Sequence, residues 1–596
     1  MKNKLIYFVF VLTLLFTSCM KHDFNFNNDE QIQNNVENVF GVKFDNTHDW
    51  CTTVNGSITV YANTSKQNIV KAQVLMSYVN NDDSTYVIKL LNEGKLSNGE
   101  NIELTYDTPI DYDILMIAFV NDKGGYFYKS FSLNDKEIYY ENNRRLSRAL
   151  SQDYNIPSTK PVINGTVETF ANKRGWLPNE VFYIYDNENL NISDYDDNFK
   201  SLFKTIIFNY LPNGRKYNNL PKIKESGYYN ESTYPITTNN EPVIVSPIYK
   251  NDGGYHEISE AELYYYYYTG ELSPSQIEAL PKYRVIDLST VYANDDNDRV
   301  YRQHSYALAY FGDGVPEIGT VGDYYFPKGY KIGFVYKSNT TSDNKKKQGE
   351  LYGDGRLNYN INHYGNFATS KLDDLDPRMG WMSVNQRMFL CIESGTDKDF
   401  NDLIIEVEGG IEQIEIIPNE PESNYYTFLY EDHNLGDYDM NDIVIKGRRI
   451  DNTTIEYTLM ACGAHDNIFI HNIDGNVINN NKEVHELFGQ PQMTFINTVE
   501  GQHFDYVIDT IKVKPYFSFL DKYTQPYIYD ATINNTVKLA TVGQDPHAIM
   551  IPYDFKWPKE RVCIKDAYLQ FNNWGQNKIM STDWYKYPEE NLIFIK

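Results

Sequence analysis

Short apolar runs broken by polar turns fill the first part of the chain, and this pattern predicts β-strands. Turn sequences such as Asn80-Asn-Asp-Asp83 separate the runs. Six runs occupy residues 56–62, 70–79, 86–91, 101–106, 113–120 and 126–133. Short strands at this spacing are typical of a β-sandwich, which we place at residues 46–142.

One helix and one unusual strand are predicted in the next region. After a polar linker at residues 143–160, residues 161–280 are mixed and mostly β in character. Apolar residues recur at helical spacing between residues 198 and 210, which predicts an amphipathic helix. The tyrosine run 264–268 places aromatic rings on both faces of an extended segment. Such a run favours burial between two layers over an exposed strip that stacks on sugars.

Strand-like runs resume near residue 281 and continue to the end of the sequence. Residues 281–410 are predicted to form an Asp-rich, jelly-roll-like β module, and residues 411–596 a further β domain. The chain is therefore predicted to be mainly β and multi-domain, with an N-terminal β-sandwich followed by jelly-roll-like β domains and few helices. A length of 596 residues, 41% of them hydrophobic, is enough for several separate cores.

An acidic motif occurs twice in the C-terminal half, each time between two short apolar runs. The copies are Asp397-Lys-Asp-Phe-Asn-Asp402 and Asp437-Tyr-Asp-Met-Asn-Asp442. A tight loop with oxygen-bearing side chains on alternate residues can direct them towards one point, which suits the six to eight oxygen ligands of Ca²⁺. The predicted calcium ligands are Asp397, Asp399, Asn401, Asp402, Asp437, Asp439, Asn441 and Asp442.

The motif differs from an EF-hand loop, because Asp402 stands at position six, where an EF-hand has glycine, and a strand-like run follows instead of a helix. Two interpretations stay open from the sequence. The loops either bind calcium, or their Asp and Asn side chains only cap the turn through nearby backbone groups.

Further short strings follow the doubled motif. They are Cys462-Gly-Ala, Glu483-Val-His-Glu-Leu-Phe-Gly489, Ile496-Asn-Thr498, Trp557-Pro-Lys-Glu560 and Ala567-Tyr568, with Trp574 and Trp584-Tyr585. Together with the motif they give residues 280–596 a resemblance to the LruC-domain lipoproteins of Gram-negative bacteria and to a module that often precedes LruC domains. The resemblance implies an envelope lipoprotein of β architecture, and it brings no catalytic residues with it.

The N-terminus has the pattern of a lipoprotein signal peptide. Lys2 and Lys4 precede an apolar run that ends at Phe16, and Thr17-Ser18-Cys19 follows. The run is too short to span a bilayer, and small residues before a cysteine favour cleavage next to an acylated Cys19. We therefore expect a signal peptide at residues 1–18 and a flexible tether at 19–45. The alternative is an ordinary secreted protein with an unmodified Cys19.

Net charge limits the class of binding partner, and cysteine spacing limits the possible metal sites. The formal net charge of −27 repels phosphate backbones, so nucleic acid is not an expected partner. The expected partners are the membrane, through the lipid on Cys19, and a glycan or protein ligand. The expected location is the outer membrane of the Gram-negative envelope, facing either the periplasm or the medium. The other cysteines lack metal-ligand spacing, and a pair of them could form a disulfide there: Cys51, Cys391, Cys462 and Cys563.

Catalytic motifs are not found. His485-Glu-Leu-Phe-Gly489 begins like a zinc-protease helix but lacks the second histidine. His465 and His471 flank Asp466 with a spacing that matches no standard metal site. A glycosidase would leave no signature, because its two carboxylates come from distant strands. We expect a non-enzymatic, calcium-stabilised protein for adhesion or ligand binding, and the alternative is a surface protein that binds or hydrolyses glycans.

Overall fold

The computed structural model divides the described part of the chain into two compact units. The C-terminal unit lies within Met1–Asn55, Asp107–Asp111 and Asn424–Lys596, and the central unit lies within Gly56–Tyr106 and Tyr112–Ser423. The structure describes residues 29–63, 68–79, 86–140, 156–167, 181–210, 234–238, 241–251, 261–292, 299–302, 304–340, 347–358, 378–385, 387–394, 400–412, 420–433, 435–472, 476–477 and 481–596. Among these residues no helix is both long and apolar enough to cross a membrane.

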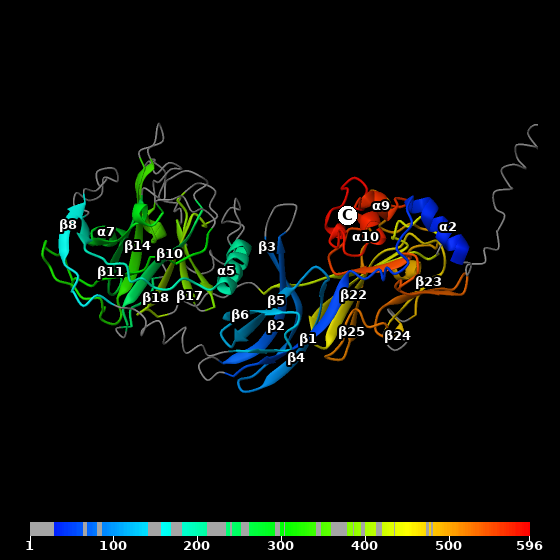
Figure 1. Ribbon diagram of the computed structural model, residues 1–596, viewed down its shortest axis with the longest axis horizontal. Helices are drawn as coiled ribbons and strands as arrows, with labels where there is room; N and C mark the ends of the chain where they lie inside the picture. The colour runs from blue at the N-terminus through cyan, green and yellow to red at the C-terminus, as the bar shows by residue number, and fades with distance from the viewer. Residues whose placement is uncertain are drawn as a thin grey trace, which may run out of the picture. The chain divides into compact units, whose positions relative to one another are not determined.

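The predicted N-terminal β-sandwich is present and includes all six expected strands (Figure 1). One sheet has the order β4-β1-β7 and the other β19-β3-β2-β5-β6. Apolar side chains such as Val60, Val74 and Ile117 fill the core between the sheets. The strands are β1 (Thr53–Tyr61), β2 (Ile69–Val79), β3 (Tyr86–Lys95), β4 (Asn101–Pro109), β5 (Ile114–Asn121), β6 (Tyr126–Ser132), β7 (Glu137–Tyr139) and β19 (Glu422–Ser423).

Two larger sheets form the rest of the central unit. One has the order β15-β14-β11-β12-β9-β8: β8 (Ile163–Val167), β9 (Phe182–Tyr185), β11 (Ala261–Tyr268), β12 (Lys282–Asp287), β14 (Lys331–Thr340) and β15 (Lys347–Tyr352). The other has the order β13-β10-β18-β17-β16: β10 (Val243–Lys250), β13 (Tyr306–Ala307), β16 (Met379–Val384), β17 (Arg387–Ile392) and β18 (Leu403–Gly409). Both sheets contribute to one apolar core. Short helices α7 (Pro274–Glu278), η4 (Leu288–Thr290) and η5 (Gly355–Leu357) complete this part.

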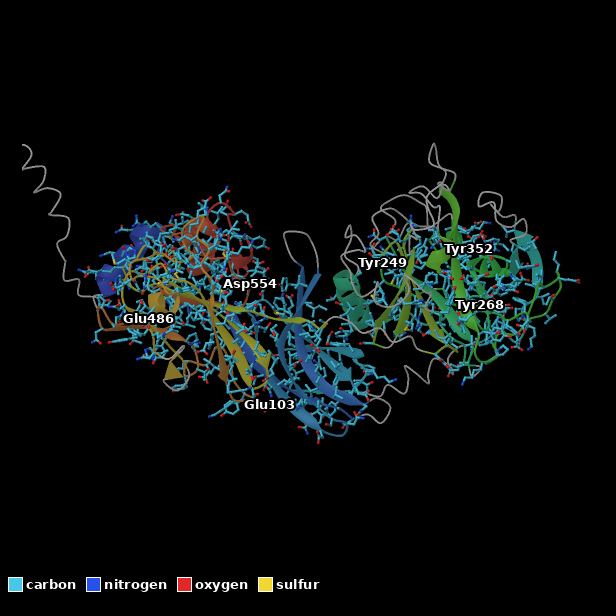
Figure 2. The ribbon with its side chains drawn as sticks, turned by 180° about the vertical axis from the view of Figure 1, so that it is seen from behind. Glu103, Tyr249, Tyr268, Tyr352, Glu486 and Asp554 are labelled. Atoms are coloured by element: carbon cyan, nitrogen blue, oxygen red, sulfur yellow. The ribbon has the colours of Figure 1, made fainter. Side chains whose placement is uncertain are left out.

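The tyrosine run lies inside this unit, on the central strand β11. Tyr265 and Tyr267 point into the core shared by the two sheets, while Tyr264, Tyr266 and Tyr268 belong to a second apolar cluster. Figure 2 labels Tyr268 among the neighbouring side chains. All five rings are buried, so the predicted two-sided burial is confirmed and no sugar-stacking strip exists at this strand.

The predicted amphipathic helix is also confirmed, as α5 (Asp197–Tyr210). Asp196 precedes it, and its Oδ1 accepts a hydrogen bond from the amide of Phe199 at 2.7 Å, which satisfies a backbone donor of the first turn. Leu202, Phe203 and Ile206 are buried on one face, as their spacing predicts.

The C-terminal unit is built around one sheet with the order β25-β22-β21-β20-β28. On β20, Phe428 and Tyr430 face one core while Leu429 faces another, because neighbouring side chains of a strand point to opposite faces. A second sheet with the order β24-β23-β26-β27 contributes to the first core. The strands are β20 (Tyr426–Tyr430), β21 (Ile443–Asp451), β22 (Thr454–Ala461), β23 (Ile468–Asn472), β24 (Asn476–Val477), β25 (Val507–Lys512), β26 (Tyr527–Asp530), β27 (Asn535–Val537) and β28 (Ala548–Ile551).

Helices close the other face of this central sheet. They are α2 (Asp29–Phe40), α9 (Ile564–Ala567), α10 (Phe571–Gln576) and the 3-10 turn η6 (Trp584–Lys586), while α8 (Val484–Leu487) is a single turn on the opposite side. Figure 1 shows α2 in blue beside α9 and α10 in red, although more than 500 residues separate them in the sequence.

Helix α2 departs from the tether expected at residues 19–45, whose first residues, up to 28, lie outside the described part. Val36 and Phe40 are buried, and the Phe40 ring stacks on Phe571 with 5.6 Å between centroids. Ile32, Val36 and Phe40 share one helical face and find apolar partners near the other end of the chain. Those partners stabilise a segment that is too polar to fold alone.

Candidate metal centre

The second acidic motif forms the predicted loop between two antiparallel strands. Tyr430 at the end of β20 pairs with Ile443 at the start of β21. Between them the backbone takes left-handed conformations at Tyr438 (φ 56°) and Met440 (φ 57°), which cost a residue with a side chain on the order of 1 kcal/mol each. Both of these side chains are fully buried in the apolar core. The acidic residues of the motif alternate with them.

Glu431 completes the loop, although it lies outside the predicted set of ligands. Its Oε1 accepts a hydrogen bond from the amide of Met440 at 2.6 Å, and its Oε2 accepts one from Tyr438 at 3.2 Å. Glu431, Asp437 and Asp439 can each place one carboxylate oxygen within 4.8 Å of the other two. Glu431 and Asp439 are buried, and Asp437 is exposed, so a cation could enter from the Asp437 side.

Asn441 adds a neutral oxygen beside this acidic cluster. Its Nδ2 donates to the carbonyl of Pro558 at 3.2 Å, and its buried Oδ1 has no hydrogen-bond partner within the described structure. A Cβ placed on Gly463 would lie 2.2 Å from that Oδ1 and 3.0 Å from Oε2 of Glu560. Two acceptor oxygens therefore converge over a glycine. Oε2 of Glu560 already accepts a hydrogen bond from the hydroxyl of Thr498 at 3.0 Å, so a bound cation would satisfy the Oδ1 of Asn441 in particular. An unpartnered buried acceptor costs about 1–3 kcal/mol.

The carboxylates of the cluster repel one another. Burial, with Asp442 and Asp437 nearby, raises the pKa of Asp439 from its ordinary value of 3.8 to about 9. Burial and the surrounding aspartates, Asp442 first, hold the pKa of Glu431 well above its usual range. Burial also raises the pKa of Glu560. Without a cation, the folded loop favours the protonated forms of these groups.

Helix α2 supports the loop from outside. The Nδ2 of Asn35 donates to the carbonyl of Gly436 at 3.2 Å, and the Phe40 ring lies 5.1 Å from the ring of Tyr438. The loop therefore rests on a segment from the opposite end of the chain.

The first copy of the motif lies between β17 and β18, and the structure describes only part of it. Asp397 and Asp399 lie outside the described residues. Asp402 accepts from the amide of Ser394 at 2.6 Å, and Oδ1 of Asn401 accepts from Nδ2 of Asn251 at 3.3 Å. The side chain of Asp402 thus caps the turn, which was one of the two interpretations left open by the sequence.

The two copies nevertheless share a loop frame. Glu393 ends the apolar run of the first copy as Glu431 ends that of the second, and each accepts a hydrogen bond from the amide of the motif's fourth residue, Phe400 or Met440. The last aspartate of each motif accepts from the residue after that glutamate. A glutamate at the same place in both repeats was the sequence signal that could have identified Glu431 as a site residue.

The remaining histidines and cysteines do not form the sites considered from sequence. His485 is buried, with its Nδ1 2.7 Å from Oε1 of Glu483 and its Nε2 3.8 Å from Sγ of Cys462. His465 packs against Phe495 and His471 against Tyr527, so the two histidines occupy different surroundings. The cysteines within the described residues are free thiols: Cys51, Cys391, Cys462 and Cys563. Cys19 lies outside the described residues.

A family model described as a domain of unknown function (DUF4842) matches residues 529–585. The matched stretch includes Glu560, whose Oε2 and the Oδ1 of Asn441 both lie over Gly463, and it reaches into η6. The C-terminal unit thus contains an uncharacterised module. The search of curated proteins gave no match, and neither did the search of solved structures.

Proposed function

We propose that the C-terminal unit is a calcium-stabilised β module of a lipid-anchored envelope protein, and that the protein acts in adhesion or ligand binding without catalysis. The observation that carries the calcium site is the buried Oδ1 of Asn441, which has no partner among the described residues and lies next to the acidic cluster. The cluster and this amide supply oxygen ligands of the kind that Ca²⁺ prefers.

The ligand set favours calcium over magnesium. Carboxylate and amide oxygens of Glu431, Asp437, Asp439 and Asn441 come from an irregular loop, and calcium accepts flexible geometries at 2.3–2.6 Å. Magnesium demands near-ideal octahedral geometry and keeps several waters. Extracellular modules bind calcium at about 10⁻⁴–10⁻³ M, which suits a site that one exposed aspartate leaves open to solvent.

The envelope location is supported by the sequence. The N-terminal charged and apolar pattern before Cys19 is that of a lipoprotein signal, and residues 280–596 resemble LruC-domain lipoproteins. We extend this resemblance to the proposal that the uncharacterised C-terminal module is of the LruC kind. The glycan-binding alternative is less well supported, because the tyrosine run that suggested sugar stacking is buried.

The test is a thermal melt of the full chain after EGTA has removed bound calcium, with unfolding monitored by tryptophan fluorescence. Four of the six tryptophans belong to the C-terminal unit: Trp50, Trp557, Trp574 and Trp584. Millimolar calcium should raise the melting temperature more than the same concentration of magnesium. At a hundredfold excess over Kd the stabilisation should be about 2.7 kcal/mol.

A double variant and a matched control make the test specific. Glu431→Gln combined with Asp439→Asn should lose most of the calcium response. Asp505→Asn, which alters an exposed aspartate of the same unit, should keep it. Equal and weak effects of calcium and magnesium on the unmodified chain would refute the calcium site.

A further inference from the structure

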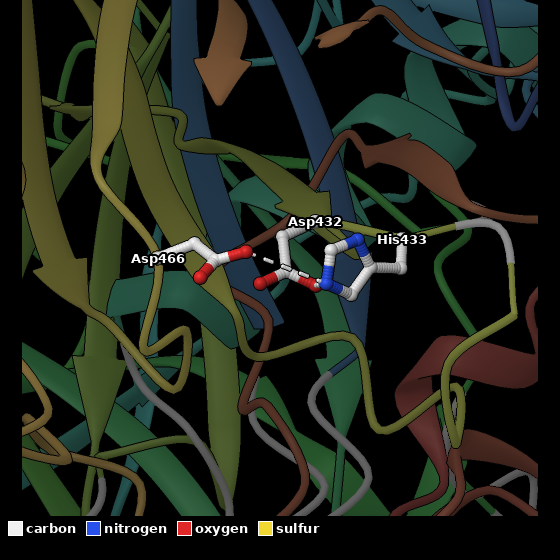
Figure 3. A group of neighbouring side chains, drawn as sticks. All are labelled: Asp432, His433 and Asp466. Carbon is white, nitrogen blue, oxygen red and sulfur yellow. Dashed lines mark ion pairs between the residues drawn. The ribbon is translucent and has the colours of Figure 1, made fainter. Parts of the chain in front are cut away.

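A second group of metal-ligating side chains joins the loop after β20 to Asp466, which the sequence placed between His465 and His471. Nε2 of His433 is 3.7 Å from Oδ1 of Asp432 and 3.5 Å from Oδ2 of Asp466 (Figure 3). The three ligand atoms all lie within 4.8 Å of one another. Ligands about 2.0–2.2 Å from a tetrahedral ion are about 3.3–3.6 Å apart, so these spacings are close to those of a bound ion.

Asp530 provides a second, independent observation. Its side chain is fully buried. Its Oδ1 accepts a hydrogen bond from the amide of Thr532 at 2.7 Å, whereas its Oδ2 has no hydrogen-bond partner in the described part of the chain. The charges of Asp466 and His433 act on it, and it acts in turn on Asp432. Asp530 is not one of the three residues whose ligand atoms lie within 4.8 Å of one another, but it lies within the electrostatic influence of Asp466 and Asp432. A buried carboxylate oxygen without a donor in such surroundings is satisfied by a cation.

The four residues come from three segments at the ends of strands in both sheets. Asp432 and His433 follow β20, Asp466 precedes β23, and Asp530 ends β26. Strands β23 and β26 are paired, with Ile468 opposite Asp530. An ion held by all four side chains would link the central sheet to the second sheet.

We propose that Asp432, His433, Asp466 and Asp530 bind a divalent transition-metal ion, of which Zn²⁺ is the first candidate. The imidazole nitrogen decides the class of metal, because Ca²⁺ and Mg²⁺ prefer oxygen ligands whereas imidazole suits zinc and its neighbours in the first transition series. His433 and Asp466 are partly exposed, so an ion can reach the site from solvent. This proposal does not depend on calcium binding at Glu431 and Asp439.

The experiment uses the full chain, stripped of metal and then kept in millimolar calcium so that the neighbouring loop is in one state throughout. Zinc chloride is titrated in and binding is followed by calorimetry, and cobalt chloride is titrated in a parallel sample to record the visible absorption of bound Co²⁺. The unmodified chain should bind one more equivalent of zinc than His433→Ala does, and its cobalt spectrum should be that of a four- or five-coordinate ion with nitrogen and oxygen ligands.

Three further variants separate the site from adventitious binding. Asp466→Asn and Asp530→Asn should each weaken zinc binding at least tenfold. His503→Ala, which removes an exposed histidine of the same unit, should leave it unchanged. A calcium-dependent melting temperature equal to that of the unmodified chain would show that a variant is folded. For folded proteins, equal zinc stoichiometry and affinity in the unmodified chain and His433→Ala would overturn the proposal. Failure of the unmodified chain to bind zinc in the presence of the millimolar calcium would overturn it as well.

Discussion

Without calcium, the free energy of unfolding of the C-terminal unit should fall as the pH rises. Most buried carboxylates that are paired in the folded state give the opposite dependence. The pKa of Asp439 is raised from 3.8 to about 9 in the metal-free fold, first by burial and then by Asp442 and Asp437. Below pH 3.8 the carboxyl is protonated in both the folded and the unfolded chain. As the pH rises from there towards 9, the unfolded chain releases a proton that the folded chain retains, so the folded state loses relative stability.

The size of the effect follows from the pKa difference. Each pH unit between the two pKa values corresponds to 1.36 kcal/mol, so Asp439 alone could remove up to about 4 kcal/mol at pH 7 relative to acid. Between pH 5 and pH 7 the loss should be on the order of 2–3 kcal/mol. For a unit of about 200 residues, 1 kcal/mol shifts the melting temperature by about 2–4 °C. The expected fall over this interval is therefore about 4–12 °C.

With calcium bound, the stability of the unit should instead rise with pH. Protons compete with the cation for the same carboxylates, and this competition weakens as the pH rises. The assay is a set of tryptophan-fluorescence melts of the full chain between pH 5 and pH 8, with EGTA or with millimolar calcium. Asp439→Asn cannot ionise and should show a shallower fall in EGTA. A metal-free melting temperature that rises from pH 5 to pH 8, with the same slope in Asp439→Asn, would refute the argument.

Three further results are expected. Phe40→Ala should lower the stability of the C-terminal unit by about 3–5 kcal/mol in the tryptophan melt, since it removes a buried ring, whereas Asn34→Ala on the exposed face of α2 should have little effect. Cys19→Ala should release the protein from membranes and abolish fatty-acid labelling; an unlabelled protein retained on membranes would contradict the lipid anchor. Trypsin should cut first at Arg144, Arg145 or Arg148, in the polar linker outside the described residues, and earlier cleavage within 56–133 would contradict the proposed linker.

Local patterns predicted the local structure well. The strands of the sandwich, helix α5 and the two-sided burial of the tyrosine run all follow from the spacing of apolar residues. The acidic loop after β20 was also predictable, because turn residues between two apolar runs constrain neighbouring residues directly.

Features that depend on residues far apart in the sequence were not predicted. Phe40 belongs to a polar stretch and is stabilised by Phe571, which no local pattern connects to it. In the sequence, the histidines nearest to Asp466 are His465 and His471, whereas the structure brings His433 to Asp466 from another loop. The unpartnered oxygen of Asn441 becomes visible only when Pro558 and Gly463 are placed beside it.

The C-terminal unit is assembled from three stretches of chain, and this has a consequence for the order of folding. The segment Asp107–Asp111 is synthesised early, yet the carboxylate of Asp107 accepts the amide of Phe519 at 2.9 Å and the hydroxyl of Ser518. Helix α2 likewise cannot make its contact with Phe571 until that residue has been synthesised. The central unit ends at Ser423, so it can be completed while these early segments still lack their partners. The residues of both proposed cation sites reach as far as Asp530 and Glu560, so these sites would form late, after the central unit has been synthesised. A newly made molecule would then bind its proposed metal ions in the compartment where the C-terminal unit folds.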